Sequence, residues 1–258
     1  MFRKSVNFAA LTACGILLAA CGNDDGSTSQ PVVSLNLASR PVGAAAARMA
    51  SIAEPYTVTD GSGNTLTFES VQLVMREIEL ERAESSIACG DDDSAVGADD
   101  SDDCEELEFG PVVVDVPLGA GPARALSVEV APGLYEKLEF EIHKPESSDD
   151  AAFIAANPDF DGVSVRVTGT YNGTPFTYTS DLDVEQEQEF APPLEVVDAQ
   201  ATELTLLVNI DNWFRTEGGV LLDPASANDG QPNEGQVKSN IETSLNAFED
   251  DDRDGDDD

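Results

Sequence analysis

A succession of short segments in which apolar and polar residues alternate constrains the fold of this chain more than any other feature. Alternation predicts strands with one buried face, because successive side chains of a strand point to opposite sides. Turn residues separate the segments, and few helical patterns intervene. The sequence therefore predicts a mainly β protein, an antiparallel β-sandwich. The predicted strands lie at 32–37, 65–68, 71–82, 112–116, 126–130, 134–142, 163–171, 176–180 and 204–210.

The pair Asn172-Gly173 lies between two of the predicted strands. Both positions of a tight two-residue hairpin turn need positive φ, and Asn and Gly adopt it most readily. The pair therefore predicts a β-hairpin. Helical patterns are confined to an alanine-rich segment at 41–53 and a short C-terminal helix at 241–248.

The longest predicted strand changes its buried face partway along. Its apolar residues follow one alternation at Val71 and Leu73 and another at Val74, Ile78 and Leu80. An extra residue in one strand reverses the alternation, so this change predicts a β-bulge.

The first twenty residues have the pattern of a bacterial export signal. A basic start precedes an apolar run that is too short to span a membrane. The run ends in Leu18-Ala19-Ala20-Cys21, which resembles the lipobox of bacterial lipoproteins. That resemblance implies that residues 1–20 are removed and that Cys21 carries the lipid. The alternative is a plain signal peptide with an unrelated cysteine.

A lipidated cysteine would hold the mature protein on a membrane, since several acyl chains together give stable anchoring. Gly22 follows the cysteine, where an aspartate would resemble the inner-membrane retention signal of enterobacteria. In a Gram-negative host this favours the outer membrane, on its periplasmic face or at the cell surface. The predicted order is a flexible tether at 21–31, a β-sandwich domain at 32–249 and an acidic tail at 250–258.

The chain is strongly acidic, with 13 basic and 51 acidic residues and a formal net charge of −38. Such a surface repels nucleic acid and anionic lipid head groups, and it attracts cations. The charge therefore argues against a nucleic-acid partner. It leaves open whether the surface is only solvated or binds cations.

Cys89 and Cys104 are the cysteines that remain once the export signal is removed and Cys21 is lipidated. Exported proteins meet an oxidising environment, so these two cysteines are predicted to form a disulfide bond that closes the acidic loop 89–104. The alternative is a pair of thiolate ligands for a metal ion.

A proline-glycine turn and a tyrosine open the predicted strand that ends at Ile142, and a second alternating segment follows at 164–169. The motif reads Ala131-Pro132-Gly133-Leu134-Tyr135. This layout resembles the transthyretin-like, broadly immunoglobulin-like, β-sandwich domains of many bacterial lipoproteins, over 107–210. The resemblance implies a fold but no reaction. The layout is also similar to that of MbnP-like copper-associated proteins, but a single histidine is too few for a histidine-based copper site.

His143, the only histidine, follows a predicted strand whose outward face carries Glu139 and Glu141. We expect an exposed histidine at the strand end, and its carboxylate neighbours could form a weak cation site. A general base would also need a nucleophile or a substrate pocket, and the sequence has no G-x-S-x-G, P-loop or H-E-x-x-H motif.

Trp213 is the only tryptophan, and we expect it in the core or as a loop anchor. The alternative is a platform on which a sugar ring stacks. Aromatic residues of the predicted hairpin could join such a platform, namely Tyr171, Phe176 and Tyr178.

Calcium is the most specific ligand that the sequence suggests. Asp250, Asp252 and Asp254, followed by Gly255, match the first half of an EF-hand loop. The chain ends at Asp258, before the acidic ligand that such a loop needs at position twelve. A complete EF-hand is therefore excluded, which leaves a half-site or a solvated acidic tail.

A second acidic cluster lies within the loop 89–104. Like charges held in a closed loop repel one another, and either Ca²⁺ or solvent and salt would relieve that repulsion. The candidate ligands there are Asp99, Asp100, Asp102 and Asp103.

We therefore expect a membrane-anchored surface lipoprotein that is a non-enzymatic binding or structural module, with weak Ca²⁺ binding and an unidentified protein or glycan partner. One rival is an exported carboxylate-dependent hydrolase acting on glycans or peptides, and another is a metal-handling protein. With 51 acidic residues, close carboxylate pairs arise by chance, so the sequence does not choose between them.

Overall fold

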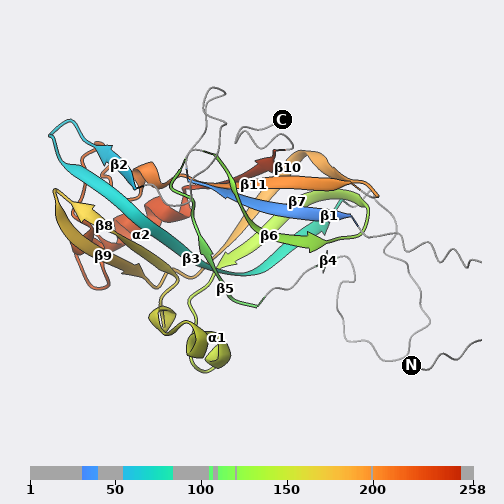
Figure 1. The fold of residues 1–258 in the computed structure, drawn as a ribbon, viewed down its shortest axis with the longest axis horizontal. Coiled ribbons are helices and arrows are strands. Elements are labelled where there is room, and N and C mark those ends of the chain that lie inside the picture. Colours follow the sequence, from blue (N-terminus) through green and yellow to red (C-terminus); the bar gives the residue numbers. More distant parts are fainter. Residues whose placement is uncertain are drawn as a thin grey trace, which may run out of the picture.

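The computed structural model describes residues 31–39, 55–83, 105–106, 110–119, 121–198 and 200–250. Over these residues the protein is mainly β, with two sheets packed together and a few short helices (Figure 1). This confirms the predicted fold class, a β-sandwich. The predicted helix within 41–53 lies outside the described residues.

The smaller sheet has four strands in the order β12-β11-β1-β6. Its strands are β1 (Val32–Ala38), β6 (Ala123–Glu129), β11 (Ala201–Val208) and β12 (Leu245–Glu249). The pair β1–β11 is parallel, whereas the predicted sandwich was purely antiparallel. Parallel pairing needs a long connection, and most of the domain lies between these two strands in the sequence.

The larger sheet has eight strands, five of them in the order β10-β7-β3-β8-β9, while β2, β4 and β5 also pair with β3. Figure 1 shows β3 crossing most of the length of the domain. The strands are β2 (Tyr56–Thr59), β3 (Thr65–Arg82), β4 (Glu105–Glu106), β5 (Val112–Asp115), β7 (Gly133–Ile142), β8 (Val165–Tyr171), β9 (Thr174–Ser180) and β10 (Val184–Val196).

The predicted bulge is present in β3. Glu77 has a φ of 50°, and the pairing of β3 with β7 shifts register between Arg76 and Glu79. Ile78 and Leu80 beyond the bulge are buried, as the change in alternation predicted. The extra residue leaves Arg76 and Glu79 at the outer face of the sheet, where they line a pocket.

The predicted hairpin joins β8 to β9. Asn172 and Gly173 have φ values of 49° and 79°, and Tyr171 pairs directly with Thr174. Both turn residues therefore have the positive φ that made this pair a hairpin signal.

Two of the aromatic side chains that could have formed a sugar-binding platform lie in the core. Trp213 is fully buried and donates a hydrogen bond from Nε1 to Ser244 Oγ over 2.8 Å, so its assignment to the core is confirmed. Tyr178 is also fully buried, with its ring edge-on to Phe214 at 5.0 Å. Buried rings cannot stack on a sugar, which removes two members of the alternative platform.

The turn-tyrosine motif has a definite structural role. The hydroxyl of Tyr135 donates a hydrogen bond to the carbonyl oxygen of Ala131 over 2.7 Å, and the ring is fully buried. A tyrosine that bonds back to the backbone a few residues upstream is typical of the corners of β-sandwiches. The guanidinium of Arg82 lies 5.5 Å from the centre of the same ring.

The predicted C-terminal helix at 241–248 is wrong in position. The helix α2 spans Glu234–Glu242, and β12 follows it. Leu245 and Ala247 are buried while Asn246 is exposed, so the segment pairs with β11 as an alternating strand. Burial against the sheet outweighs the weak local helical preference.

The remaining helices are short. They are α1 (Ala151–Ala156) and three 3₁₀ turns at Pro158–Phe160, Ile210–Asn212 and Pro224–Ala227. None of the helices in the described part of the chain is both long and apolar enough to cross a membrane.

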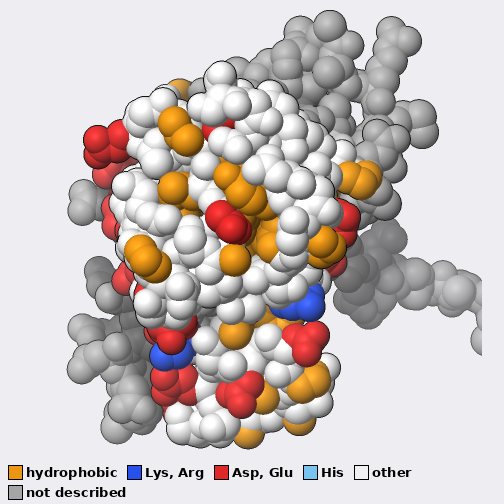
Figure 2. Space-filling view, turned by 90° about the vertical axis from the view of Figure 1, so that its left-hand side faces the viewer, with side chains coloured by type: hydrophobic (Ala, Val, Ile, Leu, Met, Phe, Trp, Pro, Cys, Tyr) orange, Lys and Arg blue, Asp and Glu red, His pale blue; other side chains and the backbone are white. Residues whose placement is uncertain are grey.

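Figure 2 views one end of the domain and shows hydrophobic side chains in small groups between polar and acidic ones. Among the described residues the large hydrophobic side chains that are exposed are Val112 and Val220. Isolated exposed apolar residues are ordinary on soluble domains, so they do not identify a docking face.

Candidate metal centre

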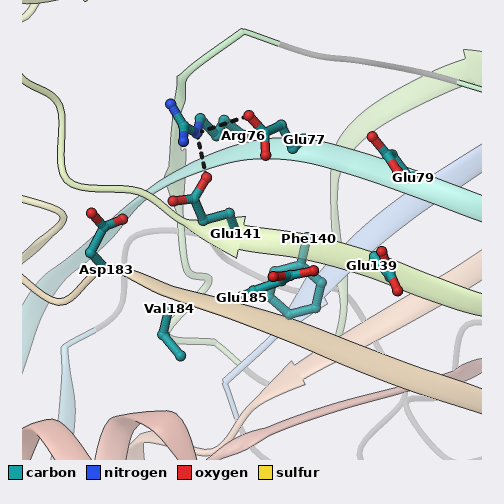
Figure 3. Close-up of a pocket in the computed structure, with 9 residues that line it drawn as sticks. All are labelled: Arg76, Glu77, Glu79, Glu139, Phe140, Glu141, Asp183, Val184 and Glu185. Atoms are coloured by element: carbon teal, nitrogen blue, oxygen red, sulfur yellow. Dashed lines mark hydrogen bonds and ion pairs between the residues drawn. The ribbon is translucent and has the colours of Figure 1, made fainter. Parts of the chain in front are cut away.

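A polar pocket of about 350 Å³ lies on the outer face of the larger sheet, over β3, β7 and the start of β10 (Figure 3). Alternation along β7 creates it, because Phe140 and Ile142 turn into the core while Glu139 and Glu141 turn outward. The residues that line it are Arg76, Glu77, Glu79, Glu139, Phe140, Glu141, Asp183, Val184 and Glu185.

His143 lies beside Glu141 and is only 5% exposed, so the expected exposed histidine is wrong. Its backbone N–H donates to the carbonyl oxygen of Val74 over 3.0 Å, which ties the residue to β3. The loop that follows β7 then returns to it, and the carboxylate of Asp150 meets the imidazole. Burial was not predictable from the strand pattern, because the covering loop is tertiary structure.

Asp150 determines which nitrogen of His143 carries the proton. Its Oδ2 lies 2.8 Å from Nε2 of His143 and also accepts a hydrogen bond from the Glu146 N–H over 3.0 Å. Burial raises the pKa of Asp150, but the bonds from His143 and Glu146 outweigh it and hold the pKa below its ordinary value. The ionised carboxylate of Asp150 accepts a hydrogen bond from the N–H at Nε2. In the neutral imidazole the lone pair is then on Nδ1.

A guanidinium nitrogen of Arg76 also lies near Nε2, at 3.5 Å, and would favour the opposite tautomer. The contact with Asp150 is much shorter and joins the ring N–H to a carboxylate. Charge-assisted hydrogen bonds at such distances are about twice as strong as neutral ones. We therefore assign the proton to Nε2.

The other ring nitrogen, Nδ1, is buried and has no hydrogen-bond partner within the described part of the chain. It lies 3.6 Å from Oε1 of Glu141 and 3.8 Å from Oδ1 of Asp183. Both distances are too long for hydrogen bonds. Two ligands of one tetrahedral ion with bonds of about 2.1 Å lie about 3.4 Å apart. The two distances from Nδ1 are therefore close to the spacing of metal ligands.

The three donor atoms lie within 4.8 Å of one another, and they come from the end of one strand and the start of its neighbour. Glu141 is in β7, His143 directly follows it, and Asp183 precedes β10. We call these residues the donor set. Since β7 and β10 pair side by side, the sheet itself holds the donor set together.

Electrostatics at the donor set favour an added cation. Burial raises the pKa of Glu141, and the neighbouring carboxyl of Asp183 raises it further, whereas the guanidinium of Arg76 opposes both. Arg76 Nε bonds Oε2 of Glu141 and lies 3.3 Å from Glu77 Oε1 (Figure 3). A divalent ion among these carboxylates would relieve the repulsion that raises the pKa of Glu141.

Of the residues predicted to bind calcium, only Asp250 lies within the described residues. Its side chain is fully buried, and its Oδ2 accepts a hydrogen bond from Thr205 Oγ1 over 2.7 Å. The Asp250 N–H also donates to the carbonyl oxygen of Glu203. Asp250 therefore continues the sheet, and its assignment to a solvated acidic tail is wrong.

The other predicted site residues lie outside the described residues. They are Cys21, Cys89, Cys104, Asp99, Asp100, Asp102, Asp103, Asp252 and Asp254. Their lipid, disulfide and calcium assignments stay predictions.

The sequence suggested part of the donor set and missed the rest. Alternation put Glu139 and Glu141 beside His143, which led to the expectation of a weak cation site. Asp183 and Asp150 were not predicted, because they reach His143 through strand pairing and a returning loop. The sequence of β10 did contain a sign of a strand, because Glu and Gln alternate over 185–189. No apolar residue occurs in that segment.

Comparison with known proteins finds no matching family model, no similar curated protein and no similar solved structure. The resemblances to transthyretin-like lipoprotein domains and to MbnP-like proteins therefore stay predictions. The argument for function starts from the geometry of the donor set.

Proposed function

We propose that this chain is an exported lipoprotein whose β-sandwich domain binds one divalent transition-metal ion through the donor set. The observation that carries the proposal is the buried Nδ1 of His143, which lacks a hydrogen-bond partner in the described part of the chain and faces two carboxylate oxygens. A buried polar atom without a partner costs about 1–3 kcal/mol. A bound metal ion would remove that cost.

Asp150 supports a metal role for His143. Histidine ligands of metals nearly always donate the second ring N–H to a carboxylate, a carbonyl or water, which sets the tautomer and the ring orientation. The 2.8 Å contact between His143 Nε2 and Asp150 Oδ2 has that arrangement.

The donor types favour a transition metal over Ca²⁺. Calcium takes six to eight oxygen ligands, whereas imidazole nitrogen suits Zn²⁺, Cu²⁺, Ni²⁺ and iron. The donor set offers one nitrogen and two carboxylates. Calcium binding by the acidic loop 89–104 is a separate proposal about residues outside those described.

A cation panel tests the proposal. Chelator-treated protein should bind one Zn²⁺ or Ni²⁺ per chain by calorimetry. At ten times the dissociation constant, binding should add about 1.4 kcal/mol to the free energy of unfolding and raise the melting midpoint by roughly 3–6 °C. Equal stabilisation by Ca²⁺, Mg²⁺ and NaCl at matched ionic strength would instead indicate screening of the net charge. Alkylated protein serves as the control for binding by free thiols.

The lipid anchor depends on Cys21. Replacing Cys21→Ser should leave a precursor that is neither lipidated nor cleaved, because the thioether forms only on sulfur. Metabolic labelling with palmitate checks this in the native host. Labelling of the variant at the wild-type level would show that the lipobox assignment is wrong.

A metal-dependent hydrolase is the second candidate, and the observation that favours it is the pocket. Three protein ligands leave at least one coordination position for water or substrate, as in catalytic zinc sites. Glu141 and Asp183 of the donor set line a pocket of about 350 Å³, which has room for both. Turnover of ester, peptide or glycoside substrates by the Zn²⁺-loaded protein, lost in Asp183→Asn, would favour this candidate over simple binding.

A further inference from the structure

Arg76 and Glu141 face each other across β3 and β7, where they are directly paired in the sheet. We propose that Arg76 makes the metal site selective against Ca²⁺ by occupying one carboxylate oxygen of Glu141. The inference rests on the proposed function, since it concerns which ions the donor set accepts.

Each oxygen of the Glu141 carboxylate has a different neighbour. Oε2 accepts a hydrogen bond from Nε of Arg76 (Figure 3). Oε1 lies 3.6 Å from Nδ1 of His143. The Glu141 side chain is 14% exposed and that of Arg76 is 30% exposed, so the ion pair is partly buried. Glu141 can therefore give a metal ion one oxygen while Arg76 holds the other.

Loss of the second Glu141 oxygen as a ligand lowers the affinity for some ions more than for others. Calcium fills six to eight positions with oxygen atoms and commonly relies on a bidentate carboxylate. Zinc and its neighbours need about four ligands, and bonds to imidazole nitrogen contribute much of their affinity. A monodentate Glu141 therefore weakens Ca²⁺ binding much more than Zn²⁺ binding.

The rest of the pocket attracts cations without distinguishing them. Its rim carries Glu77, Glu79, Glu139 and Glu185, which add negative potential for any divalent ion. The bulge at Glu77 places Arg76 at the boundary between this rim and the donor set. The geometry at Glu141 therefore determines whether the site prefers Zn²⁺ or Ca²⁺.

The test compares the ratio of the Ca²⁺ and Zn²⁺ dissociation constants in wild type and variants, by competition with an indicator. Arg76→Met removes both the charge and the hydrogen-bond donor. Removal of a charge strengthens binding of both ions, so only the ratio reports on the freed oxygen. We expect the ratio to fall on the order of tenfold in Arg76→Met, because an added carboxylate oxygen strengthens Ca²⁺ binding. Arg76→Gln keeps a donor for Oε2, and its ratio should stay near that of wild type.

Arg166→Met is the matched control. Arg166 lies in the neighbouring strand β8, and its side chain is 30% exposed, as is that of Arg76. It contacts Gln72 and Asp159 and does not line the pocket. Its loss changes the net charge equally and should leave the ratio unchanged.

The outcomes separate the two proposals. If wild type does not bind Zn²⁺, the proposed function is wrong. If wild type binds Zn²⁺ and the ratio is the same in Arg76→Met, the metal site stands and the selectivity inference is wrong. If Arg76→Met does not fold by circular dichroism, Arg76→Gln decides. A ratio near that of wild type and of Arg166→Met supports the inference, and a tenfold lower ratio overturns it, because glutamine still donates to Oε2.

Discussion

Replacing Asp183 by asparagine should weaken Zn²⁺ binding on the order of 100-fold or more, since loss of an outer-shell partner alone costs about 10–100-fold. Asp183 is suited to this test because its side chain is 50% exposed, and asparagine keeps the Oδ1 that accepts a hydrogen bond from the Lys144 N–H. The amide of asparagine keeps the shape of the side chain but removes the charge. The variant should therefore fold as wild type does.

Glu185→Gln is the control for that variant. Glu185 lines the same pocket two residues further along the chain and does not belong to the donor set. Its loss also removes one negative charge, so binding should weaken only by the change in potential, about threefold or less at physiological salt. Equal weakening by Asp183→Asn and Glu185→Gln would show that the pocket attracts cations without coordinating them.

His143→Ala extends the test to the nitrogen ligand. The imidazole is buried and bonded to Asp150, so this variant should lose both Zn²⁺ binding and some stability. Circular dichroism and the melting midpoint without metal separate the two effects. Full Zn²⁺ affinity in folded His143→Ala would contradict the proposed ligand set.

Replacing Gly169 by alanine should reduce the free energy of unfolding by at least about 3 kcal/mol, the upper part of the range for overpacking. A Cβ at Gly169 would lie 1.9 Å from the carbonyl oxygen of Thr67, a backbone atom of the adjacent strand β3. Relief of that clash requires β3 and β8 to separate where they pair. The melting midpoint should fall by roughly 6–12 °C.

The matched control for this prediction is Gly235→Ala. Gly235 lies in α2, and a Cβ there would have no heavy atom within 4 Å. Alanine has the higher helix propensity, so the same substitution should raise the free energy of unfolding by up to about 1 kcal/mol. Differential scanning calorimetry on both variants checks the opposite signs, and a Gly169→Ala variant as stable as wild type would show that β3 and β8 are not so closely paired.

Features that depend on neighbouring residues were determined by the sequence itself. The alternation over 134–142 predicted β7, and Asn172-Gly173 predicted the hairpin from the positive φ of its turn. The change of face between Leu73 and Val74 predicted a bulge in this strand, and the structure places it at Glu77. Each depends on a period of two residues or on the φ preference of one residue, and both act locally.

Strand order and helix position were decided by tertiary structure. Nothing local indicates that β1 pairs in parallel with β11, since the choice depends on how most of the domain is connected between them. The segment Leu245–Glu249 became a strand because β11 offered an edge that buries its apolar face. Strand β10 escaped prediction because its exposed Glu residues alternate with half-buried Gln, so no apolar residue marks the inner face over 185–189.

The candidate site shows the same division at the scale of single side chains. The sequence determined that Glu141 and His143 lie two residues apart at the end of β7, with Glu141 facing outward. Only the fold brought Asp183, which precedes the adjacent strand β10, and Asp150 from the returning loop to within reach of the imidazole. Because burial of His143 and the choice of its free nitrogen depend on those distant residues, the metal site is a property of the tertiary structure.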